Sequence, residues 1–136
     1  MRIIRFIDDT DTEHYGLESN SDQAELLTGD LYQGFEPSDE KATVKKNLAP
    51  LFPTNIFCIG LNYREHAAES GMELPEQPVV FAKPTSAVCG PGDAIKLPAC
   101  QNHGPETDYE CELAVIIGKP ARNVSQADAL NYVLGY

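Results

Sequence analysis

The sequence predicts an α+β fold that is mainly β. Short apolar runs of strand type recur along the chain, among them Ile3–Ile7, Ile56–Gly60 and Val79–Lys83, and turns rich in glycine and proline separate them. Helix signals occur in two stretches, residues 62–71 and 125–133. Hydrophobic residues make up 42% of the 136 residues, which is sufficient for a core.

The net charge of −11 is unevenly spread, because residues 1–40 contain eleven acidic residues and two arginines. Nucleic acids and anionic membranes bind basic patches, so this balance argues against both as partners. The first residues become acidic too early for a signal or transit peptide, and no apolar run approaches a transmembrane length. The four cysteines form no Cys-x-x-Cys pair, which indicates buried free thiols in a reducing, cytoplasmic protein.

Residues 1–50 are expected to form a small, β-rich N-terminal module. Ile3–Ile7 is its first strand. Residues 24–27 and 31–35 are predicted to form a hairpin with Gly29 at the turn, since glycine adopts the backbone conformations that tight turns require.

The rest of this module carries no evident chemistry. Residues 36–40 are expected to be an exposed turn, and His14, which stands among acidic residues, is interpreted as a solvated loop residue. Pro50 and Pro53 mark a boundary, so residues 51–136 are treated as a second part.

A strand followed by a short helix opens the second part. Residues 62–71 carry the punctuation of a helix: Asn62 is the expected N-cap, Glu65 completes a capping box, and Gly71 ends the helix.

His66 and Glu69 are three residues apart in this predicted helix and share one of its faces. A carboxylate beside an imidazole fixes its orientation and raises its basicity, as a general base requires. The alternative is an exposed polar face on a surface helix, and spacing alone favours that alternative. Lys83, at the end of the next strand, is either a surface lysine or a cation directed into a cleft, and its position alone favours the surface.

Glu110 and Glu112 precede an apolar run, residues 113–117, that is typical of a strand covered on both faces. In a strand both carboxylates point the same way, and two such charges repel each other unless a cation lies between them. Oxygen ligands suit Mg²⁺, Mn²⁺ or Ca²⁺ better than zinc. A strand end that emerges into water is the equally weighted alternative. A second helix, capped by Ser125 and ended by Gly135, is predicted to follow.

Three of these pieces, read together, resemble the fumarylacetoacetate hydrolase family. They are the Gly-Leu-Asn-Tyr-Arg-Glu-His-Ala-Ala-Glu stretch at 60–69, Phe-Ala-Lys-Pro-Thr-Ser at 81–86, and Tyr-Glu-Cys-Glu-Leu at 109–113. The similarity begins near Ile56, extends through the stretch at 123–136, and keeps the family's order. Residues 1–50 resemble, less distinctively, a module that some members carry.

The resemblance implies a role for each candidate residue. Glu110 and Glu112 match metal ligands of the family, usually for Mg²⁺ or Mn²⁺. His66 and Glu69 match a dyad on a mobile lid helix that activates water or moves a proton, and Lys83 matches a lysine that lines the substrate site. The implied fold is a mixed β-sandwich roll, commonly dimeric, so a homodimer is expected.

The family's members hydrolyse, decarboxylate or isomerise small 2-oxo and enol diacids, among them acylpyruvates, and the sequence does not choose between these reactions. In such chemistry a cation polarises the carbonyl and the imidazole–carboxylate pair supplies the base. Family members continue beyond position 136 into a segment with a further aspartate ligand. The resemblance therefore predicts a truncated domain of such an enzyme. The alternatives are a non-catalytic subunit that needs a complementary chain and a simple binding protein for acidic metabolites.

Overall fold

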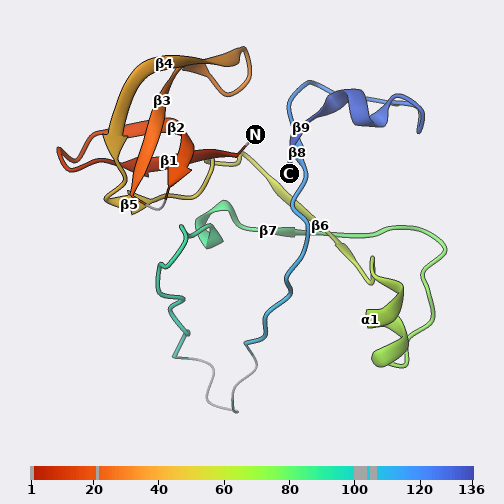
Figure 1. The fold of residues 1–136 in the computed structure, drawn as a ribbon. Coiled ribbons are helices and arrows are strands. Elements are labelled where there is room, and N and C mark those ends of the chain that lie inside the picture. Colours follow the sequence, from red (N-terminus) through yellow and green to blue (C-terminus); the bar gives the residue numbers. More distant parts are fainter. Residues whose placement is uncertain (1, 21, 100–103, 105–106) are drawn as a thin grey trace.

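The computed structural model describes residues 2–20, 22–99, 104 and 107–136, and the fold in these ranges is mainly β with one short α-helix. Figure 1 shows a sheet built from the N-terminal residues, a long two-stranded ribbon below it, and a third pair of short strands near the C-terminal end. The predicted predominance of β-structure is confirmed.

The first sheet contains five strands in the order β4-β3-β2-β1-β5, all antiparallel to their neighbours. β1 is Ile3–Ile7, as predicted, and its side chains Ile4 and Phe6 are buried against Ala24. Phe6 is completely inaccessible to solvent and is the largest fully buried side chain in the described ranges. The other strands are β2 (Glu13–Asn20), β3 (Gln23–Asp30), β4 (Gly34–Thr43) and β5 (Lys46–Asn47).

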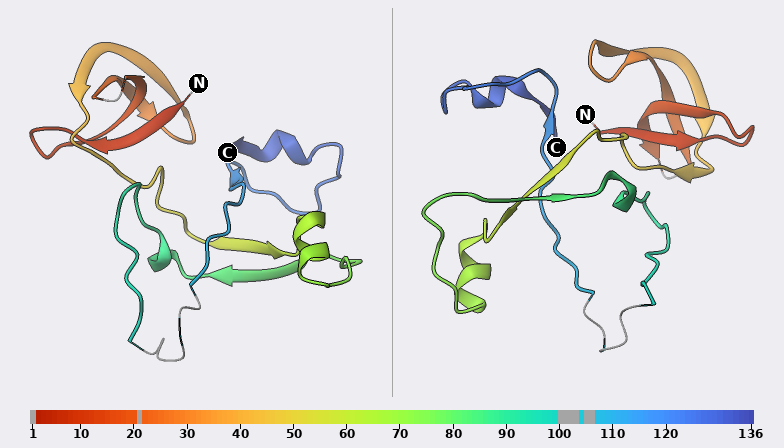
Figure 2. Two further views of the ribbon diagram at one scale, coloured as in Figure 1. Left: turned by 60° about the horizontal axis from the view of Figure 1, so that its bottom comes forward. Right: turned by 180° about the vertical axis from the view of Figure 1, so that it is seen from behind.

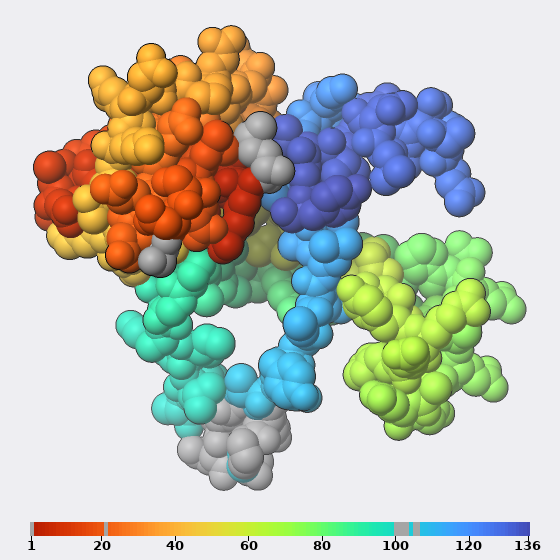
Figure 3. All heavy atoms as spheres, viewed as in Figure 1, coloured from red at the N-terminus to blue at the C-terminus, as the bar shows by residue number. Residues whose placement is uncertain are grey.

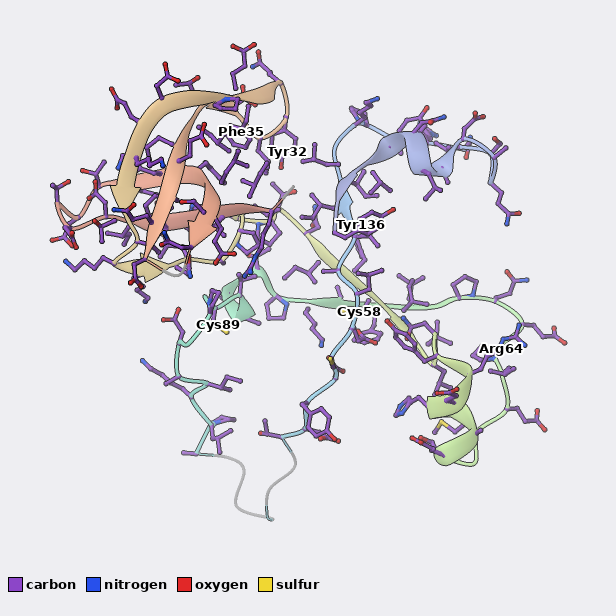
Figure 4. All side chains as sticks on the ribbon, viewed as in Figure 1. Tyr32, Phe35, Cys58, Arg64, Cys89 and Tyr136 are labelled. Carbon is purple, nitrogen blue, oxygen red and sulfur yellow. The ribbon has the colours of Figure 1, made fainter. Side chains whose placement is uncertain are left out.

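The predicted hairpin exists, but its turn lies further along the chain. Gly29 is paired with Phe35 inside the ladder, and the chain reverses at residues 31–33 (Figure 4). The Asp30 carboxylate holds this turn by accepting the N–H groups of Tyr32 at 2.8 Å and Gln33 at 2.9 Å. The expected exposed turn at 36–40 was wrong, because these residues continue β4.

His14 was also wrongly placed in a solvated loop. It belongs to β2, pairs with Phe6 across the ladder, and is half-buried. Its Nε2 lies 2.9 Å from Oδ2 of Asp8, whose carboxylate also accepts hydrogen bonds from Thr10 and Thr12. These hydrogen bonds, led by that from the Thr12 backbone, hold the pKa of Asp8 far below its usual range. A loop-like sequence is thereby organised into a tight β1–β2 turn.

Arg5 joins this sheet to the segment that leads out of it. Its guanidinium forms two hydrogen bonds with Glu13, at 2.6 and 2.7 Å, and donates a third to the carbonyl oxygen of Ala49 at 3.0 Å. The Phe52 ring lies 4.0 Å from the guanidinium carbon, at cation–π distance. Only 4% of Arg5 is exposed, and the Glu13 carboxylate compensates this buried charge.

The second sheet is the antiparallel pair β6 (Ile56–Gly60) and β7 (Val79–Lys83), and both strands agree with the prediction. Figure 2 shows α1 (Arg64–Glu69) at one end of this pair and the segment leading to β8 crossing it. One face of the pair carries Phe57, Ile59 and Val80, and these apolar side chains are exposed in the described chain.

The C-terminal region departs from the prediction. Residues 125–133 form no α-helix: a 3₁₀ turn, η2 (Ala129–Tyr132), is followed by strand β9 (Val133–Gly135), which pairs with β8 (Ile116–Ile117). Ser125 therefore caps no helix: its hydroxyl accepts the Asp128 N–H and donates to the Asp128 carboxylate, but the N-cap of η2 is Asp128, without a side-chain cap. Extended pairing from Val133 onward replaces the helix, so Gly135 is a strand residue and not a helix terminator. A second 3₁₀ turn, η1 (Thr85–Ala87), follows β7.

Two expectations about burial are also corrected. Leu113, Val115 and Ile117 are exposed, so the run at 113–117 is not a doubly covered strand in the part of the chain that is described. Cys58, Cys89 and Cys111 are free, as predicted, but the latter two are exposed, and Cys100 lies outside the described residues. No described helix is long and apolar enough to cross a membrane.

Candidate functional site

The turn from β6 into α1 sets the position of His66 and Glu69. Leu61 adopts a left-handed backbone conformation, with φ of 52°, and Tyr63 is extended and serves as N-cap. The predicted capping box of Asn62 and Glu65 is wrong, because α1 begins later and has no side-chain cap. A left-handed residue other than glycine is uncommon and costs conformational energy, which makes this turn a sharply defined feature.

The C-terminal end of α1 matches the prediction. Gly71 has a φ of +65°, its N–H bonds the Ala68 carbonyl at 3.1 Å, and the Met72 N–H bonds the Ala67 carbonyl at 2.9 Å. This pair of bonds is a Schellman motif, which requires the left-handed residue that glycine supplies without steric cost. The short helix is therefore closed at a defined point, with His66 and Glu69 three residues apart within it.

Glu110 and Glu112 do not lie on a regular strand, contrary to the prediction. Cys111 between them is left-handed, with φ of 52°, and the structure gives residues 108–115 no strand. The alternation of side chains that a strand would impose on Glu110 and Glu112 is therefore interrupted at Cys111. They nevertheless line one hollow, because the segment crosses the β6–β7 pair beside α1.

Lys83 contacts this segment directly. Its ammonium group forms a salt bridge and hydrogen bond with the Glu110 carboxylate, although 27 residues separate the two in sequence. That hydrogen bond is the main cause of a raised pKa for Lys83, and the charges of Glu110 and Glu112 also contribute. Cys58 (Figure 4) is a further neighbour whose charge interaction raises this pKa.

A hollow of about 670 Å³ lies between α1 and the carboxylate segment. Its lining includes four of the five predicted site residues: His66, Glu69, Glu110 and Glu112. Lys83 is not a lining residue but reaches the site through Glu110. Figure 3 shows the space between the yellow-green atoms of α1 and the blue atoms of the crossing segment. Three segments that are distant in sequence thus contribute to one hollow.

The side chains that line the hollow determine which metal it could hold. Within the described ranges no three His, Cys, Asp or Glu side chains are grouped as a metal cluster. Two carboxylates at the hollow are compatible with Mg²⁺, which retains several waters and is commonly held by one or two carboxylates together with oxygens of the substrate. The salt bridge with Lys83 shows that a positive charge is already accommodated at Glu110.

Several residues of the hollow were not predicted from the sequence, notably Tyr63, Phe81, Asp108 and Tyr109. Tyr63 could have been found from its spacing, because it precedes His66 by three residues and so lies near the same helical face. Asp108 and Tyr109 adjoin Glu110 but have no spacing signal of their own. Their placement depends on how the segment crosses the β6–β7 pair.

Comparison with known proteins adds a finding that is independent of this geometry. The family model described as fumarylacetoacetate (FAA) hydrolase C-terminal matches residues 55–136. A fumarylacetoacetate hydrolase domain-containing protein 2 homolog of Dictyostelium discoideum is 54% identical over 88 residues, which are 65% of this chain and 28% of that protein. An uncharacterized protein of Archaeoglobus fulgidus is 43% identical over 121 residues, covering 82% of this chain and 47% of its own length.

A solved structure shares the fold over the whole chain. The 2-hydroxyhepta-2,4-diene-1,7-dioate isomerase of Mycobacterium marinum superposes with a TM-score of 0.77 at 27% identity, covering 100% of this chain and 52% of that one. The chain therefore spans less than two thirds of the length of each of these relatives, between 28% and 52%.

Proposed function

The chain belongs to the fumarylacetoacetate hydrolase family, and from this premise we propose that it contributes the acid–base and carboxylate residues of a divalent-metal-dependent site for small 2-oxo or enol diacids. The reaction is hydrolysis of a C–C bond, isomerisation or decarboxylation. The observation that carries the proposal is the shared hollow, which His66, Glu69, Glu110 and Glu112 all line although they come from two distant segments. We further propose that residues 51–136 belong to the family's mixed β-sandwich roll.

His66 is the proposed general base and Glu69 its orienting partner. Both line the hollow from one helix, so a ligand bound there meets the imidazole at the open side of α1. The imidazole would take a proton from water or from a carbon next to the carbonyl, and return it at a later step. General acid–base catalysis of this kind contributes typically 10²- to 10⁴-fold to a rate.

Glu110 and Glu112 are the proposed ligands for Mg²⁺, with Mn²⁺ or Ca²⁺ as alternatives. When bound, such a cation would polarise the carbonyl of a 2-oxo acid. Lys83 is the proposed substrate-binding residue, because its ammonium group lies at the Glu110 carboxylate and can neutralise negative charge on a ligand oxygen. A diacid is the favoured class, since it offers one carboxylate to the cation and a second to a basic side chain.

The proposal is tested by turnover of acylpyruvates and oxaloacetate with and without Mg²⁺. Glu110→Ala is expected to abolish the Mg²⁺-dependent rate, whereas Glu73→Ala, at an exposed position outside the hollow, is the matched control. His66→Ala is expected to lower kcat by roughly 100-fold or more with Mg²⁺ affinity nearly unchanged. Unchanged activity in Glu110→Ala would remove that residue from the site, and a large loss of Mg²⁺ binding in His66→Ala would make His66 a ligand.

A second candidate function follows from the exposed apolar face of β6 and β7, on which Phe57 is 68% exposed. In this alternative the chain is a non-catalytic subunit whose surface a complementary polypeptide covers. Mass measurement in solution separates the possibilities and also tests the proposed homodimer. A monomer without turnover and without thermal stabilisation by Mg²⁺ would contradict the enzyme proposal.

A further inference from the structure

Tyr63 connects the two sides of the hollow. It is the N-cap of α1, where its carbonyl oxygen accepts the Ala67 N–H at 3.1 Å. Its side chain extends across to the carboxylate segment, where the hydroxyl oxygen accepts the backbone N–H of Leu113 at 3.3 Å. One residue therefore contacts both the helix that carries His66 and the segment that carries Glu112, although 50 positions separate Tyr63 from Leu113.

Few other contacts fix the position of helix α1. It is six residues long, which is too short to be stable in isolation, and Ala67 is its one buried residue. Within the described ranges the side chains of His66 and Glu69 form no hydrogen bond or salt bridge. A tertiary hydrogen bond at the first turn therefore has a large share in fixing the angle at which this helix meets the carboxylates.

We propose that Tyr63 is a positioning residue that latches α1 to the Glu110–Leu113 segment and so sets the distance between the His66–Glu69 dyad and the carboxylate pair. Glu112 directly precedes the anchored Leu113 N–H, so the latch acts next to a proposed ligand. The left-handed residues Leu61 and Cys111 flank the two ends of this contact, and both line the hollow. The Tyr63 side chain thereby joins the turn at Leu61 to the turn at Cys111.

The hydroxyl proton of Tyr63 remains available to a ligand. Because the oxygen accepts from Leu113, the O–H bond points elsewhere, and among the described residues no acceptor for it is found. Tyr63 lines the hollow and is partly exposed, so an anionic oxygen of a bound diacid could accept this proton. This consequence rests on the proposed function, whereas the latch itself does not.

The latch is tested without reference to activity by Tyr63→Phe, which keeps the ring and removes the acceptor. Amide hydrogen exchange of Leu113, followed by NMR on the full chain, is expected to accelerate roughly two- to tenfold, as for the loss of one hydrogen bond. The matched control is Tyr109→Phe, because Tyr109 lines the same hollow, is 90% exposed, and its hydroxyl bonds no other described residue. Unchanged exchange at Leu113, with β1–β3 resonances intact, would overturn the proposal.

The second measurement separates positioning from mere structural support. With a turned-over substrate, Tyr63→Phe is expected to lower kcat several-fold while the Mg²⁺ affinity and the thermal unfolding midpoint stay close to those of the unsubstituted chain. Loss of stability in proportion to the loss of kcat would reduce Tyr63 to a structural residue. If the unsubstituted chain shows no turnover, the proposed function fails, and the Leu113 exchange still decides whether the latch exists.

Discussion

At the scale of single residues, Lys83 is the side chain whose surroundings say most about the site. Its ammonium group pairs with Glu110, a residue proposed to bind a cation, so the two positive charges would compete for one carboxylate. From the sequence Lys83 could be placed at the end of a strand, and that was correct. Its partner could not be predicted, because the pairing depends on the path by which residues 108–113 cross β6 and β7.

This competition predicts the effect of removing the ammonium group. Lys83→Met is expected to raise the Mg²⁺ affinity of the chain about two- to fivefold, because an exposed ion pair contributes up to about 1 kcal/mol. Lys83→Arg, which keeps the charge, should change it less. Isothermal titration with Mg²⁺ measures both, and Lys96→Met, at an exposed position outside the hollow, is the control. Weaker binding in Lys83→Met would show that Lys83 assists the cation instead of competing with it.

At the scale of elements, the local sequence predicted the strands correctly where an apolar run of strand type pairs with a strand nearby in the chain. β1, β6 and β7 were predicted with their observed bounds, and α1 was located with its glycine terminator. The helix predicted at 125–133 failed because Val133 is extended and belongs to a ladder with Ile117. The periodicity of residues 125–133 does not reveal this pairing, because the partner strand β8 comes from an earlier part of the chain.

The contact between β1 and the segment after β5 gives an element-scale prediction. Arg5 bonds Glu13 of β2 and Ala49 in the connecting segment, and lysine cannot reproduce this forked geometry. Arg5→Lys is expected to lower the free energy of unfolding by about 1 to 3 kcal/mol. Urea unfolding followed by circular dichroism measures the loss. The comparison is Arg2→Lys, whose ion pair with Glu18 is largely exposed and should contribute less than about 1 kcal/mol. Equal effects of the two substitutions would contradict the assigned role of Arg5.

At the scale of the whole molecule, burial is distributed unevenly. Five of the seven buried residues in the described ranges, Ile4, Arg5, Phe6, Gly16 and Ala24, belong to the first sheet, whereas Ala67 is the buried residue of α1. Residues 51–136 carry the proposed site but few buried side chains. The sequence could predict that strands would form there. It could not predict how little they would be covered, because an apolar run has the same appearance whether or not a partner packs on it.

This distribution predicts how the chain opens. Local stability follows buried apolar contacts, so amides of β1–β3 should exchange slowest, and those of β6 and β7 much faster despite their ladder hydrogen bonds, since an isolated pair of strands is marginally stable. Mg²⁺ together with a 2-oxo diacid should then slow exchange selectively at residues 59–70 and 108–113, because a ligand stabilises the parts it holds together. Hydrogen exchange with mass spectrometry, with and without Mg²⁺, resolves these segments. Protection spread evenly over the first sheet and the hollow would show that the ligand acts on the general stability of the chain and not at the proposed site.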